Sequence, residues 1–250
     1  MPKFTVSASS QTGMVREHNE DAVLVSCRLF RDNNVNTGVF LSPDERYVVA
    51  VCDGLGGQNA GEVASMDAAE QLSKRVDTMG SGLSVEQVKR MMEEWVKEEH
   101  SYLLESGLYD ASMEGMGTTM VGMLFYEGRY CWMNCGDSRI YRFRNGILGQ
   151  VSTDHSLFQL THKIEDAHVI VNCLGGGARD VYLDFVDFTD EVREGDVLLL
   201  CSDGLTDMLP DDRIESLLQS GADATALADD AVQQGGVDNV SVCLVSIQSL

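Results

Sequence analysis

The sequence predicts an α+β fold in which two mainly antiparallel sheets pack face to face and helices cover the outside. Short apolar, β-rich runs dominate both ends of the chain, and the helical patterns are segregated from them rather than alternating with them. Turn-forming pairs, Glu127-Gly128 and Asn145-Gly146, separate neighbouring runs at hairpin spacing. Several of these runs are apolar at successive positions, so both of their faces are expected to be buried.

Nine runs have the composition of strands, and between and after them lie helical patterns. The strand-like runs are 4–8, 22–26, 47–52, 118–126, 129–135, 139–143, 181–188, 196–202 and 239–247. The first helical pattern covers Ala60 to roughly Met79, with Val63, Ala64, Leu72, Val76 and Met79 on one face. The second begins after Ser84, where Gln87 three residues later completes a capping box. A third helical region spans about Asp211 to Gln234.

Length and composition favour one large domain over residues 1–250. The chain is 44% hydrophobic and has only three prolines, so a sizeable core is expected and a Pro-rich linker is not. With 40 acidic against 18 basic residues, the formal net charge is −22. Such a field repels nucleic acid and anionic membranes, which are bound through clustered Lys and Arg. We expect neither as a partner.

The seven cysteines indicate a reducing compartment. Most lie in apolar runs such as "AVCDG" and "LLLCSDG", where cysteine commonly serves as a small core residue. No Cys-x-x-Cys pair suggests a zinc ribbon, and the N-terminus lacks the apolar segment of a signal peptide. No run reaches membrane-spanning length. These features predict a soluble, cytoplasmic protein.

Carboxylates gather at the ends of four predicted strands. Two strands finish at Asp53-Gly54 and Asp203-Gly204, and two begin after Glu20-Asp21 and at Asp238-Asn239. If these strands are antiparallel, the acidic groups meet at one edge of the core, where they would repel one another. A divalent cation removes that repulsion, and an all-oxygen ligand set suits Mg²⁺ or Mn²⁺. The glycine after Asp53 would let a backbone carbonyl approach the metal.

Two other interpretations of the Asp-Gly strand ends are less suitable, and the role of Arg16 has two alternatives. A single Asp-Gly pair is often an ordinary turn, but four matching strand ends make that explanation insufficient. A dinucleotide-binding loop is excluded because Asn59 stands at the third glycine position of "GLGGQN" and the βαβ context is missing. Arg16 could hold a phosphate or could pair with the surplus carboxylates, and the sequence leaves these two roles open.

Seven motifs in order resemble the metal-dependent protein serine/threonine phosphatases (PPM, type 2C) of the bacterial style. They are "REHNEDA" from Arg16, "DGLGG" from Asp53, "GMGTT" from Gly115, "NCGDSRIYRFRNG" from Asn134, "DHSL" from Asp154, "CSDGLTDML" from Cys201 and "DNVSV" from Asp238. The resemblance covers nearly the whole chain. It implies a four-layer αββα sandwich with a two-metal site at one end of its sheets.

The resemblance also implies roles for individual residues. Asp53 would bridge two Mn²⁺ or Mg²⁺ ions and Gly54 would offer its carbonyl to one of them. The remaining ligands would be Asp203 and Asp238 for the first metal and Glu20 for the second, with Asp21 behind it. Arg16 would bind the substrate phosphate, and Asn239 would support the ligands as part of the "DN" motif. A metal-activated water would then attack phosphorus directly, so no phosphoenzyme is expected.

Three departures from the family pattern affect the prediction. Leu55 stands where some members have histidine, so a leaving alkoxide must take its proton from water or another group. A possible third metal site would use Glu114 with Asp203 and Asp207. The flap segment, at about residues 158–173, is shortened. A Cys-x5-Arg match from Cys173 to Arg179 lacks the strand-loop-helix setting of a cysteine phosphatase.

We therefore expect hydrolysis of phosphoserine and phosphothreonine in proteins that are substrates of a Ser/Thr kinase, by a monomeric enzyme. The alternative is a non-catalytic member of the family that acts as a regulatory or binding module. The sequence favours the enzyme because every position assigned to the two-metal core is intact.

Overall fold

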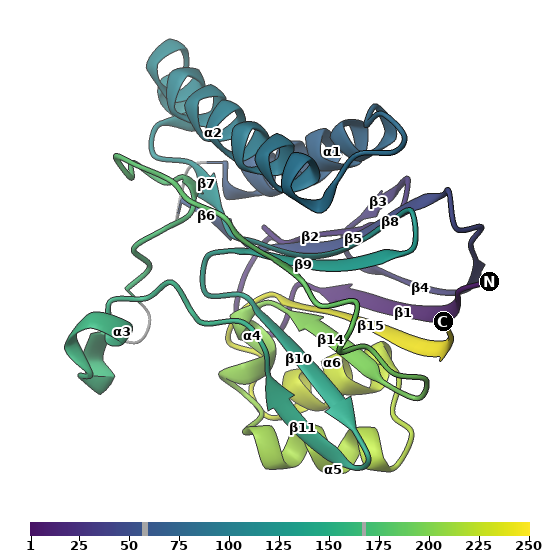
Figure 1. Ribbon diagram of the computed structural model, residues 1–250. Coiled ribbons are helices and arrows are strands. Elements are labelled where there is room, and N and C mark those ends of the chain that lie inside the picture. The colour runs from purple at the N-terminus through teal and green to yellow at the C-terminus, as the bar shows by residue number, and fades with distance from the viewer. Residues whose placement is uncertain (57–59, 167–168) are drawn as a thin grey trace.

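The computed structural model describes residues 1–56, 60–166 and 169–250. Figure 1 shows four layers, with α1 and α2 on one side, two stacked sheets in the middle and α4, α5 and α6 on the other side. Both termini lie side by side, at the ends of β1 and β15. The predicted αββα sandwich is therefore the observed architecture.

The two main sheets have six strands each, and all of their neighbouring strands are antiparallel. The first has the order β11 (Ile147–Gln150), β10 (Arg139–Arg144), β14 (Val197–Cys201), β15 (Val240–Ser249), β1 (Lys3–Gln11) and β4 (Asn33–Phe40). The second has the order β13 (Asp184–Asp187), β9 (Arg129–Cys135), β8 (Met120–Tyr126), β5 (Arg46–Cys52), β2 (Ala22–Val25) and β3 (Arg28–Phe30). A small third sheet joins β12 (Leu174–Gly175), β7 (Gly117–Thr118) and β6 (Gly54–Leu55).

The helices are α1 (Gly61–Asp77), α2 (Val85–Tyr109), α3 (Phe158–Thr161), α4 (Asp203–Thr206), α5 (Asp211–Gln219) and α6 (Ala224–Gln233). Two 3₁₀ turns, η1 (Ala111–Met113) and η2 (Ile164–Asp166), complete the elements of the described residues. The capping box is present, since the Ser84 hydroxyl accepts from the N–H of Gln87 and the Gln87 side chain accepts from the N–H of Ser84.

The two predicted hairpin turns explain part of this topology. Glu127 and Gly128, between β8 and β9, have φ of 46° and 84°. Asn145 and Gly146, between β10 and β11, have φ of 52° and 81°. Two successive residues with positive φ give the turn whose twist matches that of paired strands, and glycine and asparagine tolerate it best.

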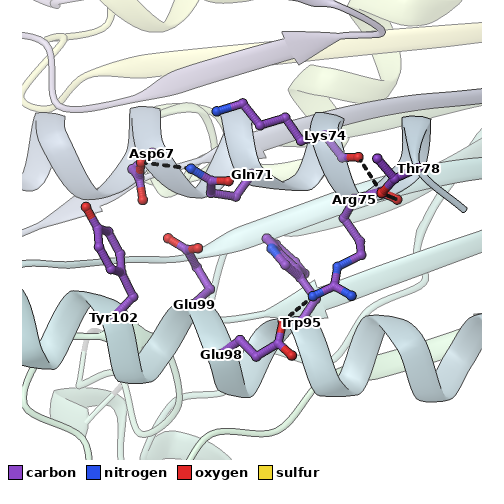
Figure 2. Close-up of a pocket in the computed structure, with 9 residues that line it drawn as sticks. All are labelled: Asp67, Gln71, Lys74, Arg75, Thr78, Trp95, Glu98, Glu99 and Tyr102. Carbon is purple, nitrogen blue, oxygen red and sulfur yellow. Dashed lines mark hydrogen bonds and ion pairs between the residues drawn. The ribbon is translucent and has the colours of Figure 1, made fainter.

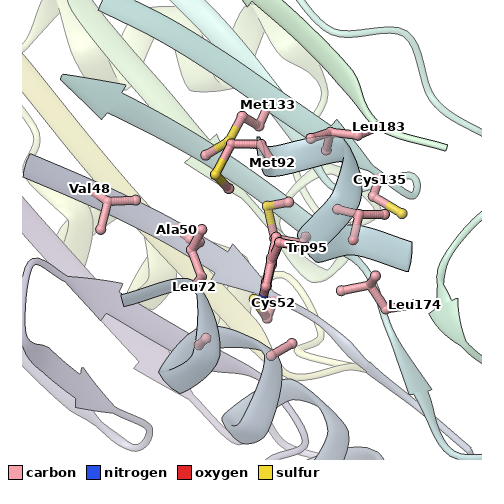
Figure 3. Packing of buried hydrophobic residues seen from close by; sticks show 14 of the residues in the cluster. Val48, Ala50, Cys52, Leu72, Met92, Trp95, Met133, Cys135, Leu174 and Leu183 are labelled. Atoms are coloured by element: carbon pink, nitrogen blue, oxygen red, sulfur yellow. The ribbon is translucent and has the colours of Figure 1, made fainter. Parts of the chain in front are cut away.

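The core has three apolar layers, and strand β5 shows how they arise. Its alternate residues Val49 and Val51 face the other sheet, whereas Val48, Ala50 and Cys52 face α1 and α2. Figure 3 shows Leu72 of α1 with Met92 and Trp95 of α2 packed over this second face. The third layer lies between the first sheet and helices α5 and α6. Strand β5, which is covered on both sides, is apolar at every position from Tyr47 to Cys52, as the sequence predicted.

Some expectations about the elements were incomplete. The third helical region is two helices, because Gly221 adopts φ of 83° between α5 and α6. Val63, predicted on the buried face of α1, is 39% exposed. Strand β4 was missed because it is an edge strand with mostly exposed polar residues.

The segment predicted as a shortened flap contains α3 and η2, and Ala167 and His168 within it lie outside the described residues. None of the helices in the described part of the chain has the length and apolar composition needed to cross a membrane. All seven cysteines carry free thiols, six of them buried and Cys27 exposed.

Candidate active site

The strand register brings the predicted carboxylates to one end of the sandwich. Ala22 of β2 lies opposite Cys52 of β5, which places Asp21 and Asp53 side by side at the end of one sheet. Cys201 of β14 lies opposite Val242 of β15, so Asp203 and Asp238 lie just beyond the paired residues at the same end of the other sheet. The two sheets meet here, since the Ser202 hydroxyl donates to Oδ2 of Asp21 over 2.9 Å. The acidic residues of four strands therefore form one cluster.

Asp53 is the centre of this cluster. Burial raises the pKa of its carboxyl well above the usual range, and repulsion from Asp21, Asp203, Asp137 and Asp238 raises it further. Its peptide group is held firmly, because the N–H of Thr119 and the hydroxyl of Thr118 both donate to the Asp53 carbonyl over 2.9 Å. The backbone is thus fixed while the side chain faces other carboxylates.

Asp21 is completely buried, and burial raises the pKa of its carboxyl to about 7 although the Ser202 hydroxyl donates to it. Its Oδ1 atom has no hydrogen-bond partner among the described residues. A buried carboxylate oxygen without a partner is costly, and a bound cation or water would satisfy it.

Glu20 lies where strand β2 approaches the start of helix α1. A Cβ on Gly54 would come within 2.4 Å of the carbonyl oxygens of both Glu20 and Gly61, so only glycine fits there. A Cβ on Gly61 would lie 3.1 Å from the Glu20 carboxylate, so that carboxylate sits at the N-terminus of α1. Burial and the nearby Glu62 raise the pKa of Glu20, and Arg16 lowers it.

Asn239 ties the loop before β2 to the final strand. Its Oδ1 accepts from the N–H of Glu20 over 2.8 Å, and its Nδ2 donates to the carbonyls of Thr12 and His18 over 2.8 and 3.0 Å. It therefore positions the segment that carries Arg16 and Glu20. In this structure Nη2 of Arg16 donates to Oδ2 of Asp238 over 2.6 Å, and both side chains are partly exposed.

Asp137 was not singled out from the sequence, although it stands in the "NCGDSR" motif. It follows β9 as Asp53 follows β5, so the strand-end signal was present. Asp137 is 8% exposed, and burial together with Asp203 raises its pKa to about 7. It lines a cavity of about 380 Å³ with Asp203, Asp207 and Thr206, and Phe158, Gln159 and Ile164 of the flap segment line the same cavity.

Glu114 is exposed on the turn after η1. It is not among the described residues that line the cavity of Asp203 and Asp207, whereas Asp137 is.

The donor set fits Mn²⁺ or Mg²⁺, since it consists of oxygens and includes the unpartnered oxygen of Asp21. Among the described residues, no three His, Cys, Asp or Glu side chains are already arranged to hold a metal ion. One predicted ligand, Asp238, is bound by Arg16 in this structure. Gly57, the last residue of "DGLGG", lies outside the described residues.

Two sequence features have no place in this chemistry. Burial raises the pKa of the Cys173 thiol to about 11, so the Cys-x5-Arg match supplies no thiolate nucleophile at neutral pH. His155 is buried, where its Nδ1 accepts from the N–H of Gly136 over 3.1 Å and its Nε2 contacts Oδ2 of Asp184 over 3.1 Å. That histidine therefore holds loops together.

A second pair of buried acidic groups lies between α1 and α2, away from the strand ends. Figure 2 shows the carboxylates of Asp67 and Glu99 pointing into a cavity of about 420 Å³, beside Trp95 and Tyr102. Glu99 is 5% exposed, and burial together with a hydrogen bond to Asp67 raises its pKa to about 8.

Comparison with known proteins decides the family. The family model described as protein phosphatase 2C matches residues 36–235. The chain belongs to the protein phosphatase 2C family.

Relatives of this family resemble the chain over most of its length. The serine/threonine phosphatase stp of Listeria monocytogenes serotype 4b is 32% identical over 248 residues, which cover 93% of this chain and 92% of that protein. The protein phosphatase PhpP of Streptococcus pneumoniae serotype 2 is 31% identical, with 97% of each chain covered. The predicted family and a protein phosphatase activity are therefore confirmed, and the non-catalytic alternative is not favoured.

A solved structure of the family agrees with the fold. The crystal structure of the catalytic domain of the serine/threonine protein phosphatase PstP in complex with two manganese ions is 29% identical, with a TM-score of 0.75 and full coverage of both chains. The α+β sandwich of this protein phosphatase 2C member is thus the family fold.

Proposed function

We propose that this protein phosphatase hydrolyses phosphoserine and phosphothreonine in proteins by metal-dependent attack of water. The observation that carries the proposal is the convergence of buried carboxylates from both sheets on Asp53. Phosphoserine and phosphothreonine are the substrate class indicated by the names of the relatives.

Asp53 would hold two divalent cations together with the Gly54 carbonyl, Asp203 and Asp238 on one side and Glu20 on the other. When bound, a pair of divalent cations lowers the pKa of a water so that it is a nucleophile at neutral pH. Asp21, which is fully buried next to Glu20, would help to hold these ligands in position. Manganese is our first choice because PstP was crystallised with it.

Arg16 would turn from Asp238 to the phosphate of the substrate. Its guanidinium is partly exposed and already donates to a carboxylate oxygen, so it can make the same bond to a phosphoryl oxygen. Leu55, the first residue after Gly54, carries no proton to give. The proton for the leaving alkoxide must come from water or from another group.

For a third ion we propose Asp137 with Asp203 and Asp207, since these three line one cavity. From the sequence, Glu114 was predicted to join Asp203 and Asp207 in this role. We expect turnover by Asp137→Asn to depend less on the Mn²⁺ concentration than turnover by the parent. Glu114→Gln serves as the matched control.

The test is manganese-dependent hydrolysis of p-nitrophenyl phosphate and of a phosphothreonine peptide, with Asp203→Asn measured beside the parent. We expect EDTA to abolish activity and the substitution to reduce it at least 10²-fold. Activity that survives both treatments would exclude the mechanism. Metal binding without turnover would instead indicate a regulatory module. The partner kinase, the monomeric state and the cytoplasmic location remain predictions.

A further inference from the structure

The small third sheet connects Asp53 to helix α2. Its strand β6 begins with Gly54, directly after Asp53, and Gly54 lies opposite Thr118 of β7. Thr118 also lies opposite Leu174 of β12, so β7 stands between the site and β12. Any displacement of β12 is therefore transmitted through β7 to the peptide groups of Asp53 and Gly54.

A single side chain of α2 fixes the far edge of this sheet. The N–H of Gly175 in β12 donates to Nδ1 of His100 over 3.0 Å. The approach is close, since a Cβ on Gly175 would lie 2.4 Å from the Met116 carbonyl oxygen and 3.1 Å from Cβ of Leu103 in α2. Because Nδ1 accepts this bond, the ring carries its proton on Nε2.

Apolar packing does not explain why a histidine stands at position 100. His100 is 5% exposed on the face of α2 that also carries Val96 and Leu103 into the core. Its Nε2 has no hydrogen-bond partner among the described residues. Burying a polar ring with one unsatisfied nitrogen is unfavourable, and an aliphatic side chain would fill the position at less cost. The contribution specific to histidine is the bond to Gly175.

The glycine-rich backbone at β12 needs hydrogen bonds from other elements to hold it in place. Gly175, Gly176 and Gly177 have φ of 65°, 64° and 71°, a run that only glycine adopts readily. Glycine loses more conformational freedom on ordering than any other residue, so this run opposes a fixed β12. The bond from Gly175 to His100, with that from the N–H of Gly176 to the Met116 carbonyl over 2.8 Å, holds it in place.

We propose that His100 is a positioning residue for the metal site, acting through β12 and β7 on Asp53 and Gly54. The inference rests on the proposed function, because it assumes that these two residues hold the cations. It gives helix α2 a role at the site, although none of the seven family motifs lies in α2.

Two substitutions in the full-length protein test this. In His100→Asn the amide oxygen takes roughly the place of Nδ1 and can still accept from Gly175, whereas His100→Leu removes the acceptor and keeps an apolar volume. We expect His100→Leu to weaken Mn²⁺ binding, measured by calorimetry, by roughly 10-fold. His100→Asn should restore it to within about threefold, and saturating Mn²⁺ should return most of kcat to His100→Leu.

Val96→Ala is the matched control, because Val96 is buried on the same face of α2 one turn earlier. It should lower thermal stability without weakening Mn²⁺ binding. Equal Mn²⁺ affinity in His100→Leu and the parent, or an equal loss in Val96→Ala, would overturn the proposal.

A measurement on the parent protein covers the case in which His100→Leu does not fold. If His100 and the cations act on the same element, Mn²⁺ must slow hydrogen exchange at the Gly175 amide, because coupling is reciprocal. An unchanged exchange rate would exclude the coupling. A parent that binds Mn²⁺ and shows this protection but hydrolyses no phosphoester would leave the inference standing and reject the proposed function instead.

Discussion

Buried carboxylates occur at the strand ends and between helices α1 and α2, and their surroundings differ. Between the helices, Glu99 faces one other acid, Asp67, and its raised pKa of about 8 means that the pair keeps one proton near pH 7, which removes the repulsion between two negative charges. At the strand ends, Asp53 faces four carboxylates from both sheets. One proton cannot remove the repulsion among five groups, whereas divalent cations offset most of it.

Both regions border a cavity. The carboxylate of Asp203 lines one that the flap segment also borders. Asp67 and Glu99 line another, together with Trp95 and the Arg75–Glu98 ion pair. The number of acids that face one another, rather than burial or a neighbouring cavity, distinguishes a catalytic cluster from a structural pair.

The largest expected effect comes from substituting Asp53, at the centre of the strand-end cluster. Asp53→Asn should lower kcat/KM for p-nitrophenyl phosphate by about 10³-fold, because it removes the negative charge of the carboxylate that would hold both cations. In EDTA the same variant should be more stable to urea than the parent, because it relieves the repulsion at the cluster. Activity within tenfold of the parent would contradict the central role of Asp53.

Cation binding should stabilise only the strand-end region. Mn²⁺ at 100 times its dissociation constant is expected to stabilise the parent by about 2.7 kcal/mol, measured by urea unfolding. Glu99→Gln should show the same gain and Asp53→Asn little of it. A gain that is lost in Glu99→Gln would mean that the cation binds between the helices.

The smallest effect concerns pH. The folded protein keeps the proton of Glu99 up to about pH 8, whereas the unfolded chain releases it near the ordinary glutamate pKa of 4.5. The folded state therefore binds more protons between these values, and stability from this group is full below pH 4.5 and is lost as the pH rises towards 8. Glu99→Gln keeps the hydrogen bond to Asp67 without titrating.

Between pH 6 and pH 8 the parent should lose about 1–2 kcal/mol more unfolding free energy than Glu99→Gln, measured by urea unfolding in EDTA. Glu98→Gln is the matched control, since Glu98 is the exposed neighbour that pairs with Arg75, and it should behave as the parent. Identical slopes for the parent and Glu99→Gln would show that the pair holds no shared proton.

Much of the fold and part of the site could be predicted because the signals are local. The continuous apolar runs, the Asn145-Gly146 turn and the Ser84 capping box depend on residues a few positions apart. The carboxylates at Asp53, Asp203 and Asp238 were singled out because each stands at a strand end, and antiparallel neighbours bring opposite ends together. The family motifs supplied their roles.

Only the tertiary structure decided which of these groups face one another. Asp137 joins the cavity of Asp203, Glu114 stays exposed, and Arg16 lies on Asp238. Likewise the bond from Gly175 to His100 and the pairing of Asp67 with Glu99 join elements distant in the chain. The pKa and the hydrogen bonds of a side chain depend on burial and on neighbouring charges, and these are set by the packing of strands and helices that sequence spacing does not specify.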